Sequence, residues 1–451
     1  MESAKTNVSI IMKKSVITLL CFAAMASQPL HAQQPAPWSL RQCCDYAVAH
    51  NIAVKQYENQ RRQQELRLST AKNSRLPDLN GSAGQNFSFG RGLTAQNTYT
   101  NTNTSSTSFS LGTSVPLFTG FQIPNTIQLN RLNLEAATQD LEKARNDIRM
   151  QVAQAYVQIL YDMEICSVAR RQISIDSAQV ARLEALLEVG RVSEADVSQQ
   201  RATLAQSQLT ATQADNNRQL ALLTLTQLLE LESPEGFSIQ VPTRLPEETL
   251  AAADVIFADA IAVKPEVQAE QLRLQATENS LKIAKSGLYP TLSFSAGLGT
   301  NYYTTSGFKS DGFGKQLQNN FSQYLGLNLN IPIFNRFQTR NQIRAARIDR
   351  ESQQLALDNV KKQLYKEIQQ ACYNTVAAQQ KLKSSETARQ AGEEAFRLMT
   401  GKYEQGKATI TEFNEARNNF LKAQSDLTQA RYEYLYQTAL VKFYRGEELS
   451  F

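Results

Sequence analysis

The longest stretch of helix-compatible sequence, residues 337–404, contains no proline. Along part of it, apolar and small residues recur at every seventh position, in two rows set three or four residues apart, one of them interrupted by Arg389. One row contains Leu364, Ala371, Ala378, Ser385, Gly392 and Met399, and the other contains Ile368, Thr375, Leu382 and Phe396. This spacing is typical of a helix that packs in the coiled-coil manner. At 1.5 Å per residue the helix would be roughly 100 Å long.

Polar residues interrupt this stretch too often for a membrane-spanning helix, which needs about 20 consecutive apolar residues. A strongly apolar run occurs only near the N-terminus, where Lys13 and Lys14 precede residues 15–26. The sequence Leu30-His31-Ala32 then resembles the end of a cleavage site. We therefore expect a secretory signal peptide over residues 1–32.

The composition gives little support for catalysis. Beyond the signal peptide, His50 is the only histidine, so histidine-based acid–base chemistry has almost nothing to work with. The four remaining cysteines suit no zinc site, and we expect packing roles for Cys43, Cys44, Cys166 and Cys372. The small positive net charge does not indicate a nucleic-acid partner. No metal cluster, nucleophile pair or phosphate loop appears in the sequence, so we expect neither enzyme activity nor a cofactor.

The chain contains two copies of one plan. Ala47-Val48-Ala49 and Pro77 recur 213 positions later, as Ala260-Ile261-Ala262 and Pro290. Val115-Pro116-Leu117-Phe118 and Val189-Gly190-Arg191 recur 216 positions later, as Ile331-Pro332-Ile333-Phe334 and Gln405-Gly406-Lys407. We expect a first structural repeat over residues 33–246, with a proline-rich linker at 233–246, and a second repeat over residues 247–451.

Each copy is expected to contain a moderate helix, two strands, a long helix and a shorter returning helix. The expected helices are residues 40–73, 123–189 and 193–232 in the first copy, and 255–286, 337–404 and 409–445 in the second. Pro265 should break or kink the helix over 255–286. The two shorter helices of a copy together match the length of the long one. They should therefore stack end to end beside it, with both helical turns far from the strands.

The expected strands are residues 79–89 and 109–117 in the first copy, and 292–302 and 321–333 in the second. They alternate between an apolar face, such as Leu325, Leu327 and Leu329, and a face of serine, glycine and asparagine. This alternation is the signature of an outer-membrane barrel, and aromatic residues such as Tyr302 and Tyr324 would supply interfacial rings. Four strands are too few to close a barrel, and lipid does not tolerate open edges. Three chains would give 12 strands. The pattern leaves open a soluble sheet that caps a helical bundle.

Three features of the sequence carry a resemblance to a known family. They are the opening Trp38-Ser39-Leu40 with Ala47 and Asn51, the proline-terminated segments before each pair of strands, and the two glycine-containing helix turns. Together they resemble the TolC-like outer-membrane efflux protein family, over residues 38–444. The resemblance implies a mainly α fold with a small β part: a homotrimer with a 12-stranded transmembrane barrel and a long helical barrel across the periplasm. It further implies a passive exit duct of a tripartite efflux pump or type I secretion system, with a periplasmic adaptor and an inner-membrane transporter as partners.

The same resemblance places a periplasmic gate at the helix turns, where Tyr403, Glu412, Glu415 and Asp196 match constricting positions. Glu412 and Glu415 lie three residues apart, hence on one helix face, and three chains would stack them as rings of carboxylates that favour cations. The simpler interpretation is that acidic residues suit a helix N-terminus.

The turns themselves are the expected docking surface for an adaptor, and they consist of Gly190, Arg191, Val192, Gly406, Lys407 and Ala408. Ala408 stands where the family has an arginine, so that polar contact is expected to be absent. The alternative for these positions is a plain helix turn with a solvated cation. For the whole chain, the alternative function is a soluble periplasmic coiled-coil adaptor or scaffold.

Overall fold

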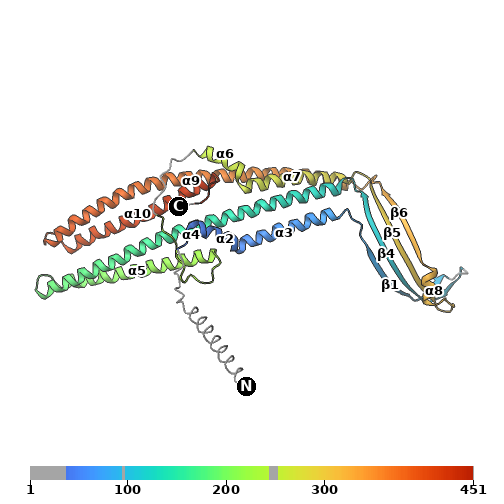
Figure 1. The fold of residues 1–451 in the computed structure, drawn as a ribbon, viewed down its shortest axis with the longest axis horizontal. Coiled ribbons are helices and arrows are strands. Elements are labelled where there is room, and N and C mark those ends of the chain that lie inside the picture. The colour runs from blue at the N-terminus through green and yellow to red at the C-terminus, as the bar shows by residue number, and fades with distance from the viewer. Residues whose placement is uncertain (1–36, 94–96, 243–251, 450–451) are drawn as a thin grey trace, which may run out of the picture.

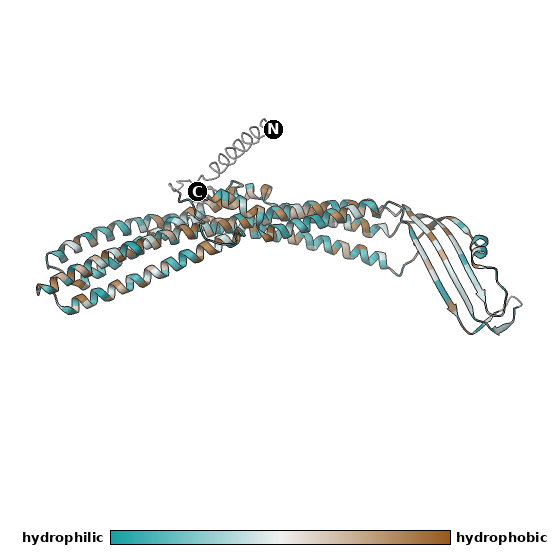
Figure 2. Ribbon diagram, turned by 60° about the horizontal axis from the view of Figure 1, so that its bottom comes forward, coloured by the Kyte–Doolittle hydropathy of each residue, from teal (hydrophilic) through white to brown (hydrophobic). Residues whose placement is uncertain are grey.

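The protein is a long helical rod continued at one end by a sheet, as a computed structural model that describes residues 37–93, 97–242 and 252–449 shows (Figure 1). The expected signal peptide and the last residues of the expected linker lie outside these ranges. Apolar and polar positions alternate along every long helix (Figure 2). Within the described ranges, no helix combines the length and apolar character needed to cross a bilayer.

Apart from the short helix α8 of the second half, the two halves of the described chain contain the same helices in the same order. The first half contains α2 (Leu40–His50), α3 (Ile52–Asn73), β1 (Asn80–Ser88), β2 (Arg91–Leu93), β3 (Tyr99–Asn101), β4 (Thr104–Phe118), α4 (Gln122–Glu188) and α5 (Glu194–Leu228). The second half contains α6 (Ala253–Val263), α7 (Pro265–Ser286), β5 (Thr291–Thr305), α8 (Phe313–Asn319), β6 (Ser322–Asn330), α9 (Gln338–Glu404) and α10 (Ile410–Tyr444). Corresponding long and returning helices have equal lengths, 67 residues for α4 and α9 and 35 for α5 and α10. The expected internal duplication is confirmed.

The first helix of each half is broken in two, although the sequence predicted the break only in the second half. Pro265 begins α7 as expected, and the preceding Lys264 has an extended backbone. In the first half the break falls at Asn51, which is also extended and caps α3 by accepting a hydrogen bond from Ala53 N at 2.9 Å. The Asn51 side chain donates to Leu228 O, at the end of α5, and the Lys264 ammonium donates to Phe443 O, near the end of α10. Both breaks therefore anchor the end of a returning helix.

The helical rod is a layer of four columns. The shorter helices α3 and α5 lie end to end along one side of α4, and α7 and α10 lie end to end along its other side, where they also contact α9 (Figure 1). The two turns lie at the end of the rod away from the sheet, as the sequence predicted. The main core joins α2, α4, α5 and α10 around Val152, Ile159, Leu225 and Leu435.

The seven-residue rows of α9 form its packing seam over the middle of the helix. Leu364, Ile368, Ala371, Thr375 and Ala378 are buried there, in part against Ile256 and Val267 of the second core. The later members of both rows, nearer the turns, are only half-buried in the single chain.

The sheet is antiparallel with the order β1-β4-β5-β6. The middle pair joins the two halves of the chain, with Gly112 opposite Gly297 and Leu111 opposite Leu298. Neither β1 nor β6 has a further strand partner in the described part of the chain. Pro332 ends the fourth strand earlier than expected, because proline lacks the N–H that a ladder needs.

Two segments expected to be loops are structured. Strand β4 begins at Thr104, five positions before the expected start, because its polar Ser and Thr residues pair with β1 and β5 on both sides. The short hairpin β2–β3 precedes it. In the second half, α8 packs on β5, where Thr300 Oγ1 donates to Leu317 O at 2.6 Å.

Candidate functional site at the helical tip

The two helix turns that the sequence singled out lie together at one end of the rod (Figure 1). Gly190 and Gly406 have positive φ angles of 71° and 68°, which glycine adopts without strain. Each turn closes with two backbone bonds; Gly406 N donates to Tyr403 O and Lys407 N donates to Lys402 O at 2.8 Å. These are the bonds of a Schellman cap, which satisfies the last carbonyls of a helix.

The predicted docking residues are presented to solvent by these caps. Gly190, Arg191, Gly406 and Lys407 are exposed, whereas Val192 and Ala408 are half-buried beneath them. The cation of each turn therefore lies next to the negative end of a 67-residue helix, where a positive charge is favoured.

Asp196 and Glu412 cap the helices that leave the turns. Asp196 accepts hydrogen bonds from Ser193 N at 3.0 Å and Ser193 Oγ at 2.6 Å, and Ser193 in turn accepts from Asp196 N. Glu412 makes the same reciprocal contacts with Thr409. These capping boxes lower the pKa of both carboxyls through the hydrogen bonds from Ser193 and Thr409. The helix-terminus interpretation, made for Glu412 and Glu415, therefore describes Glu412, and Asp196 caps its helix in the same way. The gate role of these residues stays a prediction.

Tyr403 belongs to an aromatic cluster that closes the α9–α10 turn. Its ring stacks on Phe413 with 4.9 Å between centroids, and Phe396 lies 5.5 Å from Phe413 and 5.8 Å from Phe420. Burial raises the pKa of the Tyr403 hydroxyl above its ordinary value of 10.0. The hydroxyl therefore stays protonated and polar at neutral pH.

The two hairpin tips touch each other at the Tyr403 side of the turn. Arg182 Nη1 of α4 lies 3.3 Å from Glu404 Oε1 of α9, in an exposed ion pair. The charges of Arg182 and Asp196 both act on the Tyr403 hydroxyl. Tyr403 and Asp196 thus lie at the same end of the rod, while Glu415 is exposed on α10, one turn beyond the capping Glu412.

A buried ionic contact between the two hairpins was missed by the sequence reasoning. Asp176 of α4 and Arg417 of α10 form a buried ion pair, with side chains only 1% and 6% exposed. Gln172 Nε2 and Ser207 Oγ also donate to the Asp176 carboxylate. A signal was present, because Asp176, like Asp162, is a charged residue in a mostly apolar seven-residue row that also holds Ala169 and Leu183.

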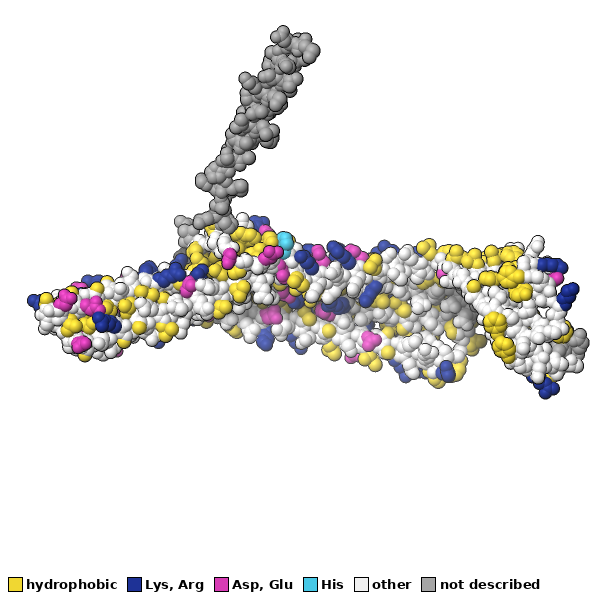
Figure 3. Space-filling model, turned by 90° about the horizontal axis from the view of Figure 1, so that it is seen from below, with side chains coloured by type: hydrophobic (Ala, Val, Ile, Leu, Met, Phe, Trp, Pro, Cys, Tyr) yellow, Lys and Arg dark blue, Asp and Glu magenta, His cyan; other side chains and the backbone are white. Residues whose placement is uncertain are grey.

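The apolar face of the sheet is the second candidate functional surface. Hydrophobic side chains gather over the sheet, while charged ones are spread along the rod (Figure 3). Leu325, Leu327 and Leu329 are 78%, 69% and 58% exposed in the single chain. The register places Leu292, Phe294 and Leu298 of β5, and Phe109, Leu111 and Val115 of β4, on the same face.

The opposite face of the sheet carries serine, glycine and asparagine, with one large exception. Tyr324 lies opposite Gly297, and its ring occupies the space that a side chain at Gly297 would fill, 2.7 Å from Tyr324 Cζ. The ring also reaches Gly112, whose Cβ position is 3.8 Å from the hydroxyl. Tyr324 is therefore on the polar face, opposite to the face of Leu325, and its place in an interfacial ring stays a prediction.

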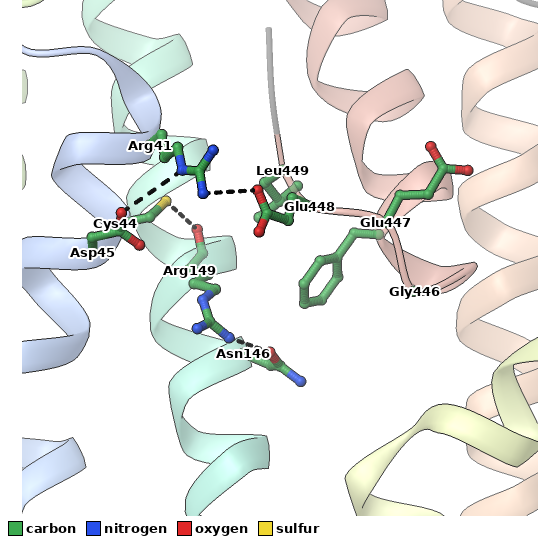
Figure 4. A pocket seen from close by; sticks show the side chains of 10 residues that line it. Arg41, Cys44, Asp45, Asn146, Arg149, Gly446, Glu447, Glu448 and Leu449 are labelled. Carbon is green, nitrogen blue, oxygen red and sulfur yellow. Dashed lines mark hydrogen bonds and ion pairs between the residues drawn. The ribbon is translucent and has the colours of Figure 1, made fainter.

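A cavity of about 220 Å³ lies where the segment after α10 returns to α2 and α4 (Figure 4). Arg41 lies 3.7 Å from Glu448 and 3.9 Å from Asp45 at its rim, and the buried Leu449 packs into the main core. Burial raises the pKa of the Cys44 thiol to about 12, so this cysteine is an unreactive packing group. The cavity thus marks where the C-terminal segment is fastened to the first half of the chain.

The other cysteines are also free thiols within the described residues, and Cys43 and Cys166 pack in apolar cores. His50 stacks on Tyr46 with 4.0 Å between ring centroids. Among the described residues, no group of histidine, cysteine, aspartate and glutamate has an arrangement suited to a metal ion.

Comparison with known proteins gives one consistent family. A family model described as "Outer membrane efflux protein" matches residues 45–230 and 257–445. The chain is 22% identical over 381 residues to outer membrane efflux protein BepC of Brucella suis biovar 1 (strain 1330), covering 82% of this chain and 77% of that one. It is also 22% identical over 381 residues to outer membrane protein TolC of Escherichia coli (strain K12), covering 83% and 76%.

Solved structures of the same fold are similar over nearly the whole chain. A CusC structure matches with a TM-score of 0.77 and 15% identity, covering 92% of this chain and 93% of that one. The CmeC outer membrane channel of Campylobacter jejuni matches with a TM-score of 0.75 and 18% identity, covering 91% and 87%.

Proposed function

Because the chain belongs to the outer membrane efflux protein family, we propose that it is the passive exit duct of a tripartite efflux pump or a type I secretion system. Its family makes it an outer membrane efflux channel, a transport protein and not an enzyme. The family match favours the channel over the soluble periplasmic adaptor or scaffold.

The observation that carries the proposal is a sheet with one exposed apolar face and two unpaired edges. In lipid, each unsatisfied backbone group costs several kcal/mol, so the edge strands β1 and β6 must find partners. One edge cannot pair with the other inside a four-stranded sheet, so the partners come from further copies. Three copies give 12 strands, an even number in the range of bacterial barrels, which agrees with the trimeric assembly that the family implies.

The two faces of the sheet indicate which side of the channel wall would meet lipid and which would meet water. The apolar face with Leu325 and Leu327 would meet lipid, and the face of small polar residues would line a wide, water-filled lumen. The helical columns continue from the sheet and would form the periplasmic tunnel. Its far end carries the turns, which places them at the entrance of the duct.

The entrance is the proposed gate. Tyr403 and its aromatic cluster, with the carboxylates of Asp196, Glu412 and Glu415, lie at this end, and a threefold ring would repeat each carboxylate three times. Rings of carboxylates attract cations and repel anions. The Arg182–Glu404 pair and the Asp176–Arg417 pair would hold the two hairpins of one chain together beside the opening.

Ion selectivity in planar bilayers tests the gate. The purified protein should conduct with a preference for cations, and the variant Glu412→Gln/Glu415→Gln should lose much of that preference. Glutamine can keep the capping contact at Glu412, so the change removes charge and preserves the helix end. The control Glu447→Gln alters an exposed carboxylate after α10, paired with Arg445 at 3.7 Å, and should leave selectivity unchanged. Equal selectivity in all three proteins would contradict the gate.

The exposed turns are the proposed docking surface for the periplasmic adaptor. A photo-crosslinking amino acid at Val192 or Ala408, in cells that make the whole pump, should form an adduct with the adaptor. The same group at Glu447 should not. Adaptor adducts from Glu447 alone would contradict docking at the turns.

A further inference from the structure

The four long strands of the sheet contain no charged residue on either face. Strands β1, β4, β5 and β6 consist of apolar residues together with serine, threonine, glycine, asparagine, glutamine and tyrosine. The polar face, proposed above to line the lumen, therefore carries no ionised side chain along these strands. A solute that passes along this face meets ionised side chains of the sheet region only beyond the strand ends.

A cavity of about 520 Å³ lies at the end of the sheet away from the rod, where α8 also lies (Figure 1). Ser88, Thr104 and Thr305 line it, and they pair with one another across β1, β4 and β5. Tyr303, two residues before Thr305, lies on the same face of β5 as Gly297, which is opposite Tyr324. The cavity therefore opens on the polar face, at the outer mouth of the proposed channel.

Three aromatic rings line this cavity and stay exposed in the single chain. Phe89 follows β1, Tyr303 belongs to β5 and Phe308 follows β5, and their exposed fractions are 76%, 46% and 53%. Aromatic rings favour stacked or edge-to-face contacts with other rings and gain from leaving water. A cavity that combines such rings with a few polar groups is typical of a site for a small molecule.

Arg91 is the one charged side chain among the described residues that line the cavity. Its guanidinium lies 5.9 Å from the centre of the Tyr99 ring, and no ion pair joins it to a carboxylate of the described residues. The planar guanidinium can donate two parallel hydrogen bonds to a carboxylate or a phosphate. Arg91 therefore suits a ligand that brings its own anionic group.

We propose that this cavity binds small aromatic anions, with the anionic group on the Arg91 guanidinium and the ring among Phe89, Tyr303 and Phe308. The proposal rests on the channel proposed above, in which the cavity faces the lumen at the outer mouth, and it names a class of solute for that mouth. Three copies of the chain repeat the site three times around the exit. A bound anion there narrows the path of the ions and lowers the current.

The lining of the cavity distinguishes this class of ligand from three related ones. A cationic ring meets the like charge of Arg91, which repels it. An uncharged ring gains the aromatic contacts without the charge-assisted hydrogen bonds, and an aliphatic carboxylate gains those bonds without the aromatic contacts. Benzoate should therefore bind more tightly than benzylammonium, benzyl alcohol or acetate.

Saturation-transfer NMR on the full chain in lipid nanodiscs measures this binding, with empty nanodiscs as the blank. Benzoate at neutral pH is the probe, and benzylammonium, benzyl alcohol and acetate are the comparisons. The Arg91→Gln variant removes the positive charge and should weaken benzoate binding at least about tenfold, because hydrogen bonds to charged groups are the stronger ones. The Arg91→Lys variant keeps the charge without the planar fork, and its affinity should lie between the two.

Two further variants separate the site from a general effect of charge. Lys309→Gln is the matched control, because Lys309 is exposed next to Phe308 and does not line the cavity. It removes one positive charge from the same end of the sheet and should leave benzoate binding unchanged. Phe308→Ala keeps Arg91 and should reduce the preference for benzoate over acetate. Arg91, Lys309 and Phe308 are all exposed, so these substitutions leave the packed core intact.

Planar bilayers place the site at one end of the channel. Benzoate added to each side in turn should interrupt the current of the wild type and of Lys309→Gln, and more strongly from one side than from the other. The Arg91→Gln variant should conduct with far fewer interruptions. Equal interruption from both sides, unchanged in Arg91→Gln, would place the effect outside this cavity.

The outcomes separate the inference from the proposed function. If Arg91→Gln and Lys309→Gln weaken benzoate binding equally in a conducting protein, the site is wrong while the channel stands. If benzyl alcohol binds as tightly as benzoate, or none of the four probes binds, the inference is overturned. If benzoate binds through Arg91 to a protein that does not conduct, the site stands and the proposed channel falls.

Discussion

Asp176 Oδ1 and Arg417 Nη1 lie 2.5 Å apart, both side chains are buried, and the two residues come from opposite halves of the chain. Asp176 lies 12 residues before the end of α4, about 18 Å above the turn. Below this level the hairpins are joined by exposed contacts such as Arg182–Glu404. The ion pair therefore fixes the level at which the two hairpins of one chain are firmly tied.

Removing one partner of the buried Asp176–Arg417 pair should destabilise the protein far more than removing one partner of the exposed Glu184–Arg201 pair. Asp176→Ala leaves the Arg417 charge buried and unpaired, which costs about 3–5 kcal/mol. Glu184→Ala leaves Arg201 in water and costs at most about 1 kcal/mol. Thermal unfolding of the detergent-purified proteins measures the difference, and the double change Asp176→Leu/Arg417→Met should recover most of the loss. Equal shifts for Asp176→Ala and Glu184→Ala would show that the pair is not a strong contact.

Gly120, at the junction of β4 and α4, should tolerate alanine much less than Gly190. Both have a positive φ, which costs an L-residue about 1–2 kcal/mol. A Cβ at Gly120 would also lie 2.6 Å from Ser286 O and 2.9 Å from Tyr289 Cβ, whereas one at Gly190 meets nothing within 4 Å. The Gly120→Ala variant should therefore show the larger fall in unfolding midpoint. A larger fall in the unfolding midpoint for Gly190→Ala than for Gly120→Ala would contradict close packing around Gly120.

Acid should weaken the helix caps at the tip only below the ordinary pKa of their carboxyls. The backbone N–H of Thr409 lowers the pKa of Glu412 from 4.5, so the cap is fully formed above pH 4.5 and is lost as the pH falls through the lower folded value. Hydrogen exchange of the tip, compared between wild type and Glu412→Ala at each pH, measures this. The difference should stay constant from pH 8 to 5 and shrink below 4.5. A difference that shrinks already between pH 7 and 5 would contradict the cap.

The sequence predicted the elements whose cause is local. From the seven-residue rows and the glycines at 190 and 406, both ends of α4 and α9 were predicted to within one residue. The duplicated order, with the proline before each pair of strands, was equally visible. These features need no knowledge of distant contacts, because periodicity and helix caps act over a few residues.

What the sequence did not predict depends on partners far along the chain. The break at Asn51 is held by Leu228, and the early start of β4 at Thr104 by pairing with β5. The Asp176–Arg417 pair joins positions 241 residues apart. In the candidate site, the capping of Glu412 followed the helix-terminus interpretation, whereas the aromatic cluster around Phe413 was not expected. The packing of the Tyr324 ring against Gly297 on the polar face was not expected either, because it depends on a glycine in the neighbouring strand.

Electron microscopy of the full chain purified in detergent is the most direct test of the trimeric conduit. The account predicts a threefold-symmetric cylinder, with a 12-stranded barrel at one end, a helical tunnel, and a narrow end formed by the turns at Gly190 and Gly406. A monomer that stays in solution once detergent is removed, with β1 and β6 still unpaired, would contradict it.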